Sequence, residues 1–404
     1  MTTVTIQRLG HQGDGIAEGP VFVPRTLPGE VVEGAIVAGR MEAPRILTPS
    51  EQRIRPACPH YRGCGGCAVQ HVTEAFVTDW KESVIRTALA AHGIEAPFRA
   101  PHVSPLSSRR RAVFSGRRLK KGALVGFHAR ASDVITSVPE CRILHPDLIA
   151  ALPLIEDLTA RFGSRKAELS LSLTRSDAGL DLAVTGGKAP DGALWAELGQ
   201  WAGQSGLARL AWAGEVIAQA QPPFHHIGPA QVTPPPGAFL QATKPAEAAL
   251  QAAVAEVVGD AAHVLDLFAG CGTFALPLAR GAEVHAVESD AAMLAALDHG
   301  WRQAKGLKLV THEARDLFRR PILPEDLTKF DAAVIDPPRA GAEAQTAALG
   351  ASGIRRIAAV SCNPASFARD AKLLIAAGFR LDWVQMVDQF RFSPHVELAA
   401  QLTR

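Results

Sequence analysis

Cys362 is the side chain of this 404-residue sequence best placed to act as a nucleophile. It follows the apolar run IAAVS and precedes Asn-Pro, where a helix is predicted to begin, so it lies at the carboxyl end of a predicted strand. A helix N-terminus nearby favours the thiolate form of a cysteine. The alternative is a buried packing cysteine, which is common for isolated residues. Its position at a ligand-binding sheet edge favours the reactive thiol.

A glycine-rich turn predicts a cofactor loop at the same edge. The string VLDLFAGCGTF has the pattern of a strand, a tight turn and a helix start, and Gly270 and Gly272 let the backbone approach a ligand closely. Glu288 ends the next predicted strand, where a carboxylate can accept hydrogen bonds from both ribose hydroxyls of a nucleoside cofactor. Nicotinamide enzymes use a third glycine where this chain has Ala275. With Asp266 on the strand, the D-x-F-x-G-x-G spelling resembles that of methyltransferases and favours S-adenosylmethionine.

A thiolate beside a methyl donor suits methylation of carbon 5 of uracil. Carbon 5 is a poor nucleophile, but addition of a thiolate to carbon 6 gives it enolate character, so that it can attack a methyl sulfonium. A base must then remove the carbon-5 proton before the thiolate leaves. The tail VDQFRFSPHVELAAQL offers Asp388, His395 and Glu397. We expect Glu397 to be the base, with its pKa raised by burial, and His395 to have a positioning role; the alternative for Glu397 is an exposed strand carboxylate.

Four further cysteines have the spacing of a metal site. Cys58, Cys64 and Cys67 lie within CPHYRGCGGC with C-x5-C-x2-C spacing, and Cys141 can supply a fourth ligand. A large chain without an export signal favours metal ligation over disulfides. Four thiolates suit either zinc or an iron–sulfur cluster, although zinc sites more often have two paired C-x2-C knuckles.

Taken together, D-L-F-x-G-x-G-T-F, D-P-P-R, S-C-N-P and H-V-E resemble the motifs of RNA uracil-C5 methyltransferases, which act on 23S ribosomal RNA and transfer RNA. The resemblance covers nearly the whole chain. It implies that Cys362 is the nucleophile and Glu397 the base. It also implies that S-adenosylmethionine is bound by Gln241, Phe268, Thr273, Glu288, Asp316 and Asp336. Family members often carry Asn in place of Thr273, and the tail FRFSPHVE departs from the more usual F-P-x-T-x-H-x-E.

The cysteines distinguish two branches of that family. In the ribosomal-RNA branch, as in this chain, three cysteines lie close together in sequence and a fourth lies apart, a division that resembles a [4Fe-4S] site. The transfer-RNA branch typically lacks these cysteines. The resemblance therefore implies a [4Fe-4S] cluster in preference to zinc, and 23S ribosomal RNA in preference to transfer RNA. An amino-group methyltransferase would need an aromatic residue where this chain has Arg339, and would leave Cys362 unused. A non-catalytic iron–sulfur RNA-binding protein would be expected to have lost its cofactor loop or its nucleophile.

A basic stretch is the predicted RNA contact. Between Arg99 and Arg130 the sequence has nine Arg or Lys and no Asp or Glu. The string SSRRRAVFSGRRLKKG predicts a strand pair with a basic face, on which phosphates would be neutralised and exposed aromatic side chains such as Phe114 and Phe127 could stack on bases. A charge run is more often a solvated surface, but beside a uracil-modifying site it favours RNA binding.

Three regions are expected to position these residues. Residues 1–50 are short β-branched runs broken by Gly and Pro, which predict a small OB-like barrel; LGHQGDGIA and VFVPRTLPGE resemble a TRAM domain, an RNA-binding module. Residues 51–235 predict a mixed α+β domain with the cysteines, a helix at about 78–92 and a proline-rich linker at 222–236. Residues 236–404 alternate strands and helices, which predicts a doubly wound, Rossmann-like α/β methyltransferase domain.

Composition agrees with this organisation. A hydrophobic fraction of 47% and a charged fraction of 20% are typical of a globular protein, and the net charge of +2 neither requires nor excludes a nucleic-acid partner. No apolar run is long enough for a membrane span and no secretory signal is evident. We expect a cytoplasmic monomer whose partner is RNA.

Overall fold

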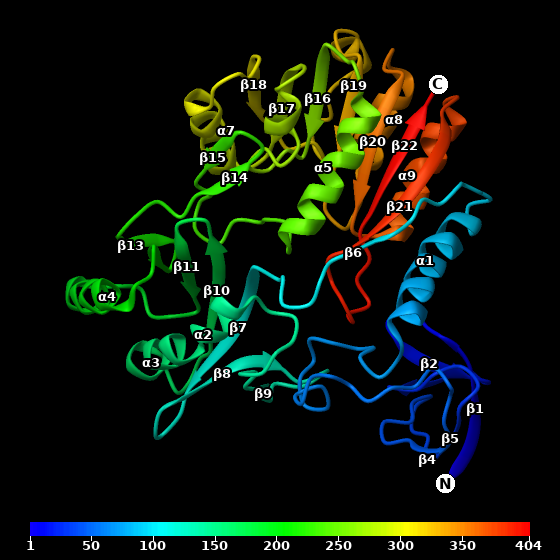
Figure 1. The fold of residues 1–404 in the computed structure, drawn as a ribbon, viewed down its shortest axis with the longest axis vertical. Coiled ribbons are helices and arrows are strands. Elements are labelled where there is room, and N and C mark those ends of the chain that lie inside the picture. The colour runs from blue at the N-terminus through cyan, green and yellow to red at the C-terminus, as the bar shows by residue number, and fades with distance from the viewer.

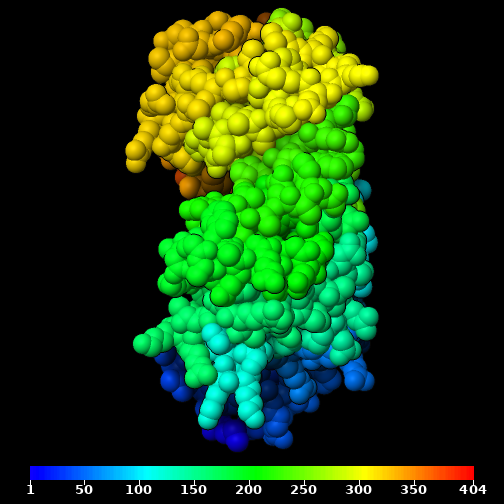
Figure 2. Space-filling view, turned by 90° about the vertical axis from the view of Figure 1, so that its left-hand side faces the viewer, coloured from blue at the N-terminus to red at the C-terminus, as the bar shows by residue number.

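The computed structural model describes residues 1–404, and its three main sheets follow one another along the long axis of the molecule (Figure 1). Figure 2 shows this order on one face, with the N-terminal residues at one end, residues of the central sheet in the middle and the C-terminal half at the other end. No helix combines the length and the apolar character needed to cross a bilayer.

The N-terminal sheet is built from five antiparallel strands in the order β3-β2-β1-β4-β5. These strands are β1 (Thr2–Leu9), β2 (Asp14–Ala17), β3 (Val21–Pro24), β4 (Val31–Gly34) and β5 (Arg45–Thr48). Its small core includes Val23, Val32 and Met41, all fully buried. The end strands β3 and β5 do not pair with each other, but the outer edge of β3 is bridged at Phe22 to Arg40 before β5, and the OB-like barrel stays a prediction.

The central sheet has seven strands in the order β13-β12-β11-β10-β7-β8-β9. They are β7 (Arg111–Arg118), β8 (Ala123–His128), β9 (Ile135–Thr136), β10 (Leu169–Ser176), β11 (Gly179–Thr185), β12 (Arg209–Trp212) and β13 (Glu215–Gln219). The helices of this region are α2 (Pro146–Ala150), α3 (Leu152–Phe162) and α4 (Gly192–Ser205). The predicted basic strand pair is therefore present as β7 and β8, and the tip of this hairpin projects at the lower left of Figure 1.

The predicted role of Phe114 in base stacking is wrong. Phe114 is fully buried and stacks on Phe127 with ring centroids 4.9 Å apart, inside the core of the central sheet. Alternation along a strand indicates two faces but does not say which one is covered. On β7 the covered face is that of Ala112 and Phe114, because α3 packs against it, while Val113 is exposed.

The C-terminal sheet has eight strands in the order β18-β17-β16-β19-β20-β22-β21-β6. They are β16 (His263–Leu267), β17 (Glu283–Glu288), β18 (Val310–Ala314), β19 (Ala332–Ile335), β20 (Arg356–Ser361), β21 (Arg380–Asp388), β22 (Leu398–Thr403) and the short β6 (His102–Val103). The strands from β18 to β20 are parallel, and β22 runs antiparallel between β20 and β21. This confirms the predicted methyltransferase fold of alternating strands and helices, whose parallel strands end at one edge.

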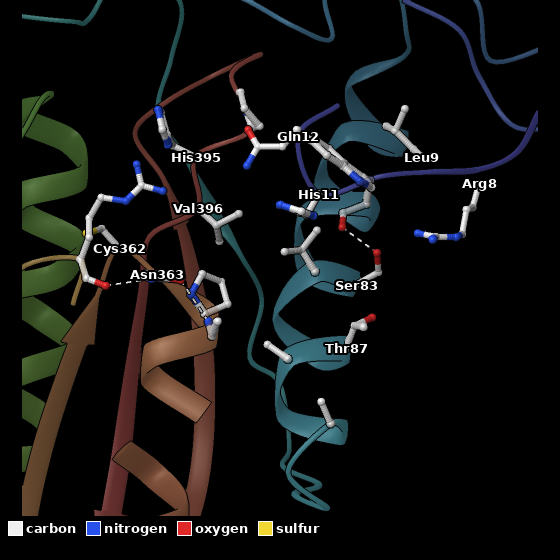
Figure 3. Close-up of a pocket in the computed structure, with 18 residues that line it drawn as sticks. Arg8, Leu9, His11, Gln12, Ser83, Thr87, Cys362, Asn363, His395 and Val396 are labelled. Atoms are coloured by element: carbon white, nitrogen blue, oxygen red, sulfur yellow. Dashed lines mark hydrogen bonds between the residues drawn. The ribbon is translucent and has the colours of Figure 1, made fainter. Parts of the chain in front are cut away.

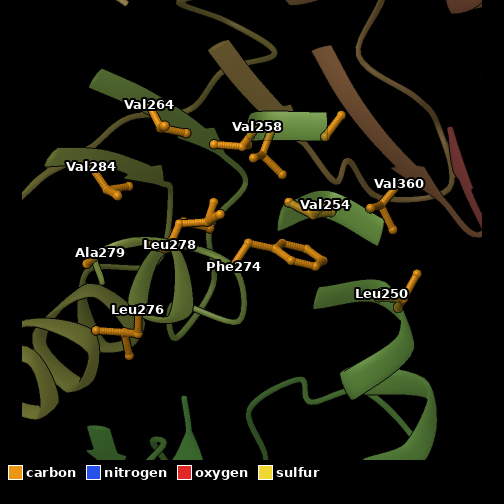
Figure 4. Close-up of a cluster of buried hydrophobic side chains, with 14 of the residues drawn as sticks. Leu250, Val254, Val258, Val264, Phe274, Leu276, Leu278, Ala279, Val284 and Val360 are labelled. Atoms are coloured by element: carbon orange, nitrogen blue, oxygen red, sulfur yellow. The ribbon is translucent and has the colours of Figure 1, made fainter. Parts of the chain in front are cut away.

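Helices cover both faces of the C-terminal sheet. They are α5 (Lys244–Val258), α6 (Ala275–Leu278), α7 (Ala291–Gln303), α8 (Glu343–Ala351) and α9 (Pro364–Ala376), with a 3₁₀ helix at Pro324–Leu327. Figure 4 shows one of the two resulting cores, where Phe274 lies between Leu250 and Val254 of α5 and the side chains around α6. Side-chain caps fix several helix starts: Asp290 begins α7, and Asn363 begins α9 by accepting a hydrogen bond from the backbone N–H of Ala365.

Three segments assigned to the central region pack on the C-terminal domain instead. Helix α1 (Glu74–Ala90), expected at about 78–92, contacts α9, and β6 pairs with β21. The proline-rich linker contains a hairpin of β14 (His225–Ile227) and β15 (Ala230–Val232), whose fully buried Ile227 and Val232 join the core of the catalytic domain. Prolines flank the hairpin and Pro229 lies in its turn, so none interrupts a strand, and the composition of the segment did not reveal its packing.

A buried ion pair fastens α1 to the C-terminal domain. Lys81 and Asp388 are 0% and 3% exposed, with Nζ and Oδ1 2.8 Å apart, and Nζ also donates to the carbonyl of Phe390 at 3.0 Å. We expect Lys81→Met to lower the free energy of unfolding by about 3–5 kcal/mol, because it leaves a buried carboxylate uncompensated. Glu82→Gln breaks only the exposed i,i+4 pair with Arg86 and should cost under about 1 kcal/mol. Urea unfolding compares the two variants; equal losses would contradict this expectation.

Candidate active site

The cofactor loop connects β16 to α6 in a strained conformation. Phe268, Gly270 and Gly272 have φ angles of +64°, +56° and +90°. A Cβ atom at Gly272 would lie 2.9 Å from Leu297, so only glycine fits there, whereas a Cβ at Gly270 would meet no atom within 4 Å. Gly272 thus packs the turn against α7, and Gly270 leaves open space beside the backbone for a ligand.

Glu288 lies next to this loop, as predicted. Its Oε2 accepts a hydrogen bond from the backbone N–H of Gly270 at 3.0 Å, and its Oε1 accepts from Ser289 and Asp290. Thr273 begins the turn into α6 and its carbonyl accepts from Gln251 at 2.9 Å. Phe268 packs on Phe318, two residues after Asp316, with ring centroids 5.6 Å apart. Asp316 accepts from the backbone N–H of Phe318 at 3.0 Å.

Asp266 is a fully buried carboxyl group below the loop. Its Oδ2 accepts from the backbone N–H of Ala275 at 2.9 Å, and its Oδ1 has no hydrogen-bond partner. Burial, and after it the nearby charges of Asp336 and Glu288, raise the pKa of Asp266 to about 8 against the lowering effect of the Ala275 hydrogen bond. Asp266 is therefore protonated in the folded protein at neutral pH.

This raised pKa predicts a pH-dependent stability. A carboxyl whose folded pKa is raised stabilises the fold fully below its unfolded pKa, near 4, and that contribution is lost as pH rises through about 8. In the cofactor-free protein the free energy of unfolding should therefore fall between pH 6.5 and 8. We expect Asp266→Asn to remove up to about 1.4 kcal/mol per pH unit of that fall. Urea unfolding at both pH values measures it; an unchanged difference between wild type and variant would contradict the assignment.

Cys362 lies immediately after β20 and before the Asn363 cap of α9, as predicted. The side-chain amide of Asn363 donates to the carbonyl of Arg339 at 2.8 Å, which ties the end of β20 to the segment after β19 (Figure 3). Cys362 is half-buried and lines two cavities. In this way the strand edge presents the thiol to open space.

The two cavities approach Cys362 from different sides. The first, of about 430 Å³, lies between α1, the segment Arg8–Gln12 of the N-terminal sheet and Cys362; Figure 3 shows Ser83 and Thr87 of α1 across it from Asn363. The second, of about 610 Å³, reaches from Cys362 past Arg339 and His395 to the four cysteines of the predicted metal site.

The prediction that a helix N-terminus makes Cys362 a thiolate is wrong for the free protein. Burial, and after it the negative charges of Glu397 and Asp336, raise the pKa of the Cys362 thiol to about 11, and Arg339 only partly opposes them. The thiol is therefore protonated at neutral pH. Glu397 immediately precedes β22 and Asp336 immediately follows β19, and the fold brings both carboxyl groups to the thiol, so its local sequence did not reveal them.

Glu397 is buried and close enough to Cys362 to affect its pKa. It is 4% exposed, so the alternative of an exposed strand carboxylate is wrong. Burial raises the pKa of Glu397, the charge of Asp336 raises it further, and a hydrogen bond from Gln389 lowers it. The pKa of Asp336 is raised by burial as well. A carboxyl poised above its ordinary range is suited to accepting a proton near neutral pH.

The other candidates in the tail have different surroundings. Asp388 is committed to Lys81 and is not available as a base. His395 is exposed and lines both cavities with Cys362, and burial of its ring with the charge of Arg339 lowers its pKa. Gln389 is a residue that the sequence analysis missed. It hydrogen-bonds both Gln241, a predicted cofactor contact, and Glu397. The signal in the sequence that could have found it is a polar side chain directly after the apolar strand β21.

The four cysteines of the predicted metal site line the second cavity together. Burial raises the pKa of Cys64 and Cys141, and raises that of Cys67 to about 12. Cys58 is buried, and the backbone N–H of Gly66 donates to the sulfur of Cys64 at 3.3 Å. No group of three or more His, Cys, Asp or Glu side chains is arranged to hold a single metal ion.

The basic stretch is partly neutralised by acids from elsewhere in the sequence. Arg99 pairs with Glu256, Arg110 with Glu247 and Arg117 with Glu168. Arg130 binds both carboxylate oxygens of Asp14 in the N-terminal sheet, at 2.5 and 2.8 Å. The exposed cations that remain at the hairpin tip are Arg118, Lys120 and Lys121. The basic stretch has no acidic residues in its own sequence, but the fold places acidic residues from other segments beside it.

Comparisons with known proteins agree with this site. A family model for tRNA (uracil-5-)-methyltransferases matches residues 235–404. An RNA methyltransferase from Rhizobium meliloti is 43% identical over 411 residues, covering 100% of this chain and 99% of the relative. The 23S rRNA (uracil(1939)-C(5))-methyltransferase RlmD of Vibrio cholerae is 33% identical over 425 residues, covering 98% of this chain and 94% of the relative.

The fold has a solved counterpart as well. The structure of Pyrococcus abyssi tRNA (uracil-54, C5)-methyltransferase in complex with S-adenosyl-L-homocysteine has a TM-score of 0.79 to this chain, at 21% identity, and 99% of each chain is covered. The likeness thus extends over all three sheets. On the sequence relatives and the family match, this chain belongs to the RNA uracil-C5 methyltransferase family and is an S-adenosylmethionine-dependent RNA (uracil-C5)-methyltransferase.

Proposed function

We propose that this enzyme methylates carbon 5 of a uridine in 23S ribosomal RNA through a covalent bond between Cys362 and carbon 6, with Glu397 as the base. The observation that carries the proposal is the meeting of three groups at one sheet edge: a thiol open to two cavities, and the carboxyls of the buried Glu397 and the half-buried Asp336, close enough to raise its pKa. Nucleophile and base must both reach one pyrimidine ring, and this arrangement supports that.

Each protein group has a defined part in the reaction. The thiol of Cys362 first gives its proton to solvent in the cavity that it lines, and its sulfur bonds to carbon 6, which moves electron density to carbon 5. Bound S-adenosylmethionine supplies the methyl group that carbon 5 then takes up. Glu397 removes the proton remaining on carbon 5, and the electron pair of that C–H bond expels the sulfur from carbon 6. The products are the methylated uridine, free Cys362 and S-adenosylhomocysteine.

The cofactor residues follow from the resemblance together with their position. We propose that Gln241, Phe268, Thr273, Glu288, Asp316 and Asp336 bind S-adenosylmethionine. Support comes from the open backbone at Gly270, which Glu288 already contacts, and from the Phe268–Phe318 pair beside Asp316. Reaching carbon 6 requires the uridine to be unstacked, as in other base-modifying enzymes.

The choice of 23S ribosomal RNA over transfer RNA has two supports. The Vibrio cholerae relative that covers nearly the whole chain is named for a 23S uridine. The chain also carries the four cysteines expected of that branch. Such a substrate would place the enzyme in the cytoplasm, where we expect a monomer.

Mapping of 5-methyluridine tests this choice. RNA from cells with and without the enzyme is compared at every uridine, and purified enzyme is given 23S ribosomal RNA or transfer RNA as separate substrates. We expect loss of one 23S signal and unchanged transfer RNA. Loss of a transfer-RNA signal alone would favour a transfer-RNA enzyme, and no change in either RNA would overturn both.

We further propose that Cys58, Cys64, Cys67 and Cys141 hold a [4Fe-4S] cluster. The four thiols fit the group chemically, since all line one cavity and thiolates are the usual ligands of such clusters. With four protein ligands the cluster would be closed, so its part would be in folding or RNA binding. Protein purified without oxygen should be brown, with about four irons per chain. A colourless protein with stoichiometric zinc would favour the zinc alternative.

A further inference from the structure

Gln389 connects the proposed base to the proposed cofactor side of the pocket. It is 1% exposed. Its Nε2 donates to Oε2 of Glu397 at 3.0 Å and to Oε1 of Gln241 at 2.6 Å, and its Oε1 accepts from the backbone N–H of Ala242 at 2.7 Å. All three bonds are buried. The groups they join have no access to water, so each bond satisfies a donor or acceptor that would otherwise have no partner.

The orientation of this amide is determined by its surroundings. The N–H of Ala242 can only donate, so the carbonyl oxygen of Gln389 must face it. The two amide hydrogens then point to Gln241 and Glu397, both of which offer oxygens. A flipped amide would set two donors against each other and leave two acceptors facing an oxygen. Gln389 is therefore a donor to the Glu397 carboxyl.

Glu397 has no other side-chain hydrogen bond in the structure, and the charge of Asp336 raises its pKa. Burial and that like charge favour the protonated acid, which cannot accept a proton. A donated hydrogen bond stabilises the carboxylate form instead. Gln389 thus opposes the two effects that would make Glu397 ineffective as a base.

The segment that holds the Gln389 amide, residues 241–242, is itself held by a residue from another part of the chain. Arg110 holds the segment before α5, because its Nε donates to the carbonyl of Gln241 at 3.1 Å and its backbone N–H donates to the carbonyl of Ala242 at 2.9 Å. Arg110 in turn forms a buried pair with Glu247 of α5. The position of the Gln389 amide therefore follows the segment 241–242 rather than the exposed loop that contains His395.

We propose that Gln389 is the positioning residue for the base, holding Glu397 as a proton acceptor beside Cys362 and linking its orientation to Gln241. This rests on the proposed function, in which Glu397 removes the carbon-5 proton and Gln241 contacts the cofactor. Binding or loss of the cofactor at Gln241 would then affect the orientation of Glu397 through the single side-chain amide of Gln389. Release of the methylated RNA depends on Gln389. Formation of the bond between Cys362 and carbon 6 does not.

Gln389→Met removes the donor and keeps a similar volume. We expect release of methylated RNA to slow by at least about tenfold, so that the covalent RNA–protein adduct accumulates in a denaturing gel, with KM for RNA within about threefold of wild type. The acid limb of the kcat profile should move to higher pH by on the order of one unit, because the pKa of Glu397 rises when its donor is lost. Gln345→Met is the matched control: Gln345 is as deeply buried but bonds only the backbone of Ile322.

A second variant guards against loss of folding. Gln389→Glu keeps the shape and the acceptor for Ala242 but places a carboxyl against Glu397, and it should shift the acid limb in the same direction. If Glu397→Gln traps an adduct while both Gln389 variants release RNA with the wild-type pH profile, the positioning role is wrong and the proposed function stands. If Glu397→Gln traps nothing and releases product normally, the proposed base is wrong and the role of Gln389 falls with it.

Discussion

Replacing Cys362 with alanine is expected to abolish methylation of RNA, lowering single-turnover methyl transfer by several orders of magnitude. The reason is chemical: without sulfur bonded to carbon 6, carbon 5 has no enolate character with which to attack a methyl group. Binding of S-adenosylmethionine should be nearly unchanged, because the thiol lies after β20 and the cofactor loop after β16. Transfer of labelled methyl groups to RNA and calorimetric cofactor binding measure the two effects separately.

Cys271 provides the matched control. It lies within the cofactor loop but is 2% exposed and packs in the core, where burial raises the pKa of its thiol to about 12. Cys271→Ala should keep the covalent adduct and most of the activity, with only a loss of stability from the small space created. Methylation retained by Cys362→Ala in a single turnover would contradict the covalent mechanism.

The pH dependence of bond formation follows from the same surroundings. A thiol whose pKa is raised to about 11 requires its proton to be removed during the reaction rather than before it. The charges of Glu397 and Asp336, when these groups are ionised, disfavour the free thiolate of Cys362. The resting enzyme is in this way protected from reactions of an exposed thiolate.

The parts of the site that sequence could predict are those fixed by strand order. Cys362 and Asp336 each follow a parallel strand and Glu288 ends one, and such strands end at one sheet edge, so their convergence could be expected from spacing alone. Gly270 and Gly272 were predictable for a similar reason, since a tight turn between strand and helix requires positive φ angles.

The remainder depends on residues far apart in sequence. The basic stretch lost four of its nine cations to pairing with Asp14, Glu168, Glu247 and Glu256, none of which lies within it. The protonation of Cys362 depends on carboxyls from two other strands. Helix α1 joined the catalytic domain because Lys81 meets Asp388, 307 residues away. Periodicity predicted the helix but could not predict its partner.

Replacing Glu397 with glutamine is expected to stop the reaction after methyl transfer. The amide oxygen of the variant can still accept the hydrogen bond from Gln389, so the local structure should persist, but an amide cannot take up the carbon-5 proton. The bond between Cys362 and carbon 6 then cannot break. Turnover should fall by about 10²–10⁴-fold while a methylated RNA–protein adduct accumulates.

A denaturing gel with labelled methyl donor detects that adduct, and two controls define its origin. Glu325→Gln removes an exposed carboxylate of the same domain and should turn over like the wild type. Cys362→Ala combined with Glu397→Gln should lose the adduct, because the sulfur that forms it is absent. If Glu397→Gln alone releases methylated RNA at the wild-type rate, another group removes the carbon-5 proton. The carboxyl of Asp336, whose pKa is also raised, would then be the next candidate for the base.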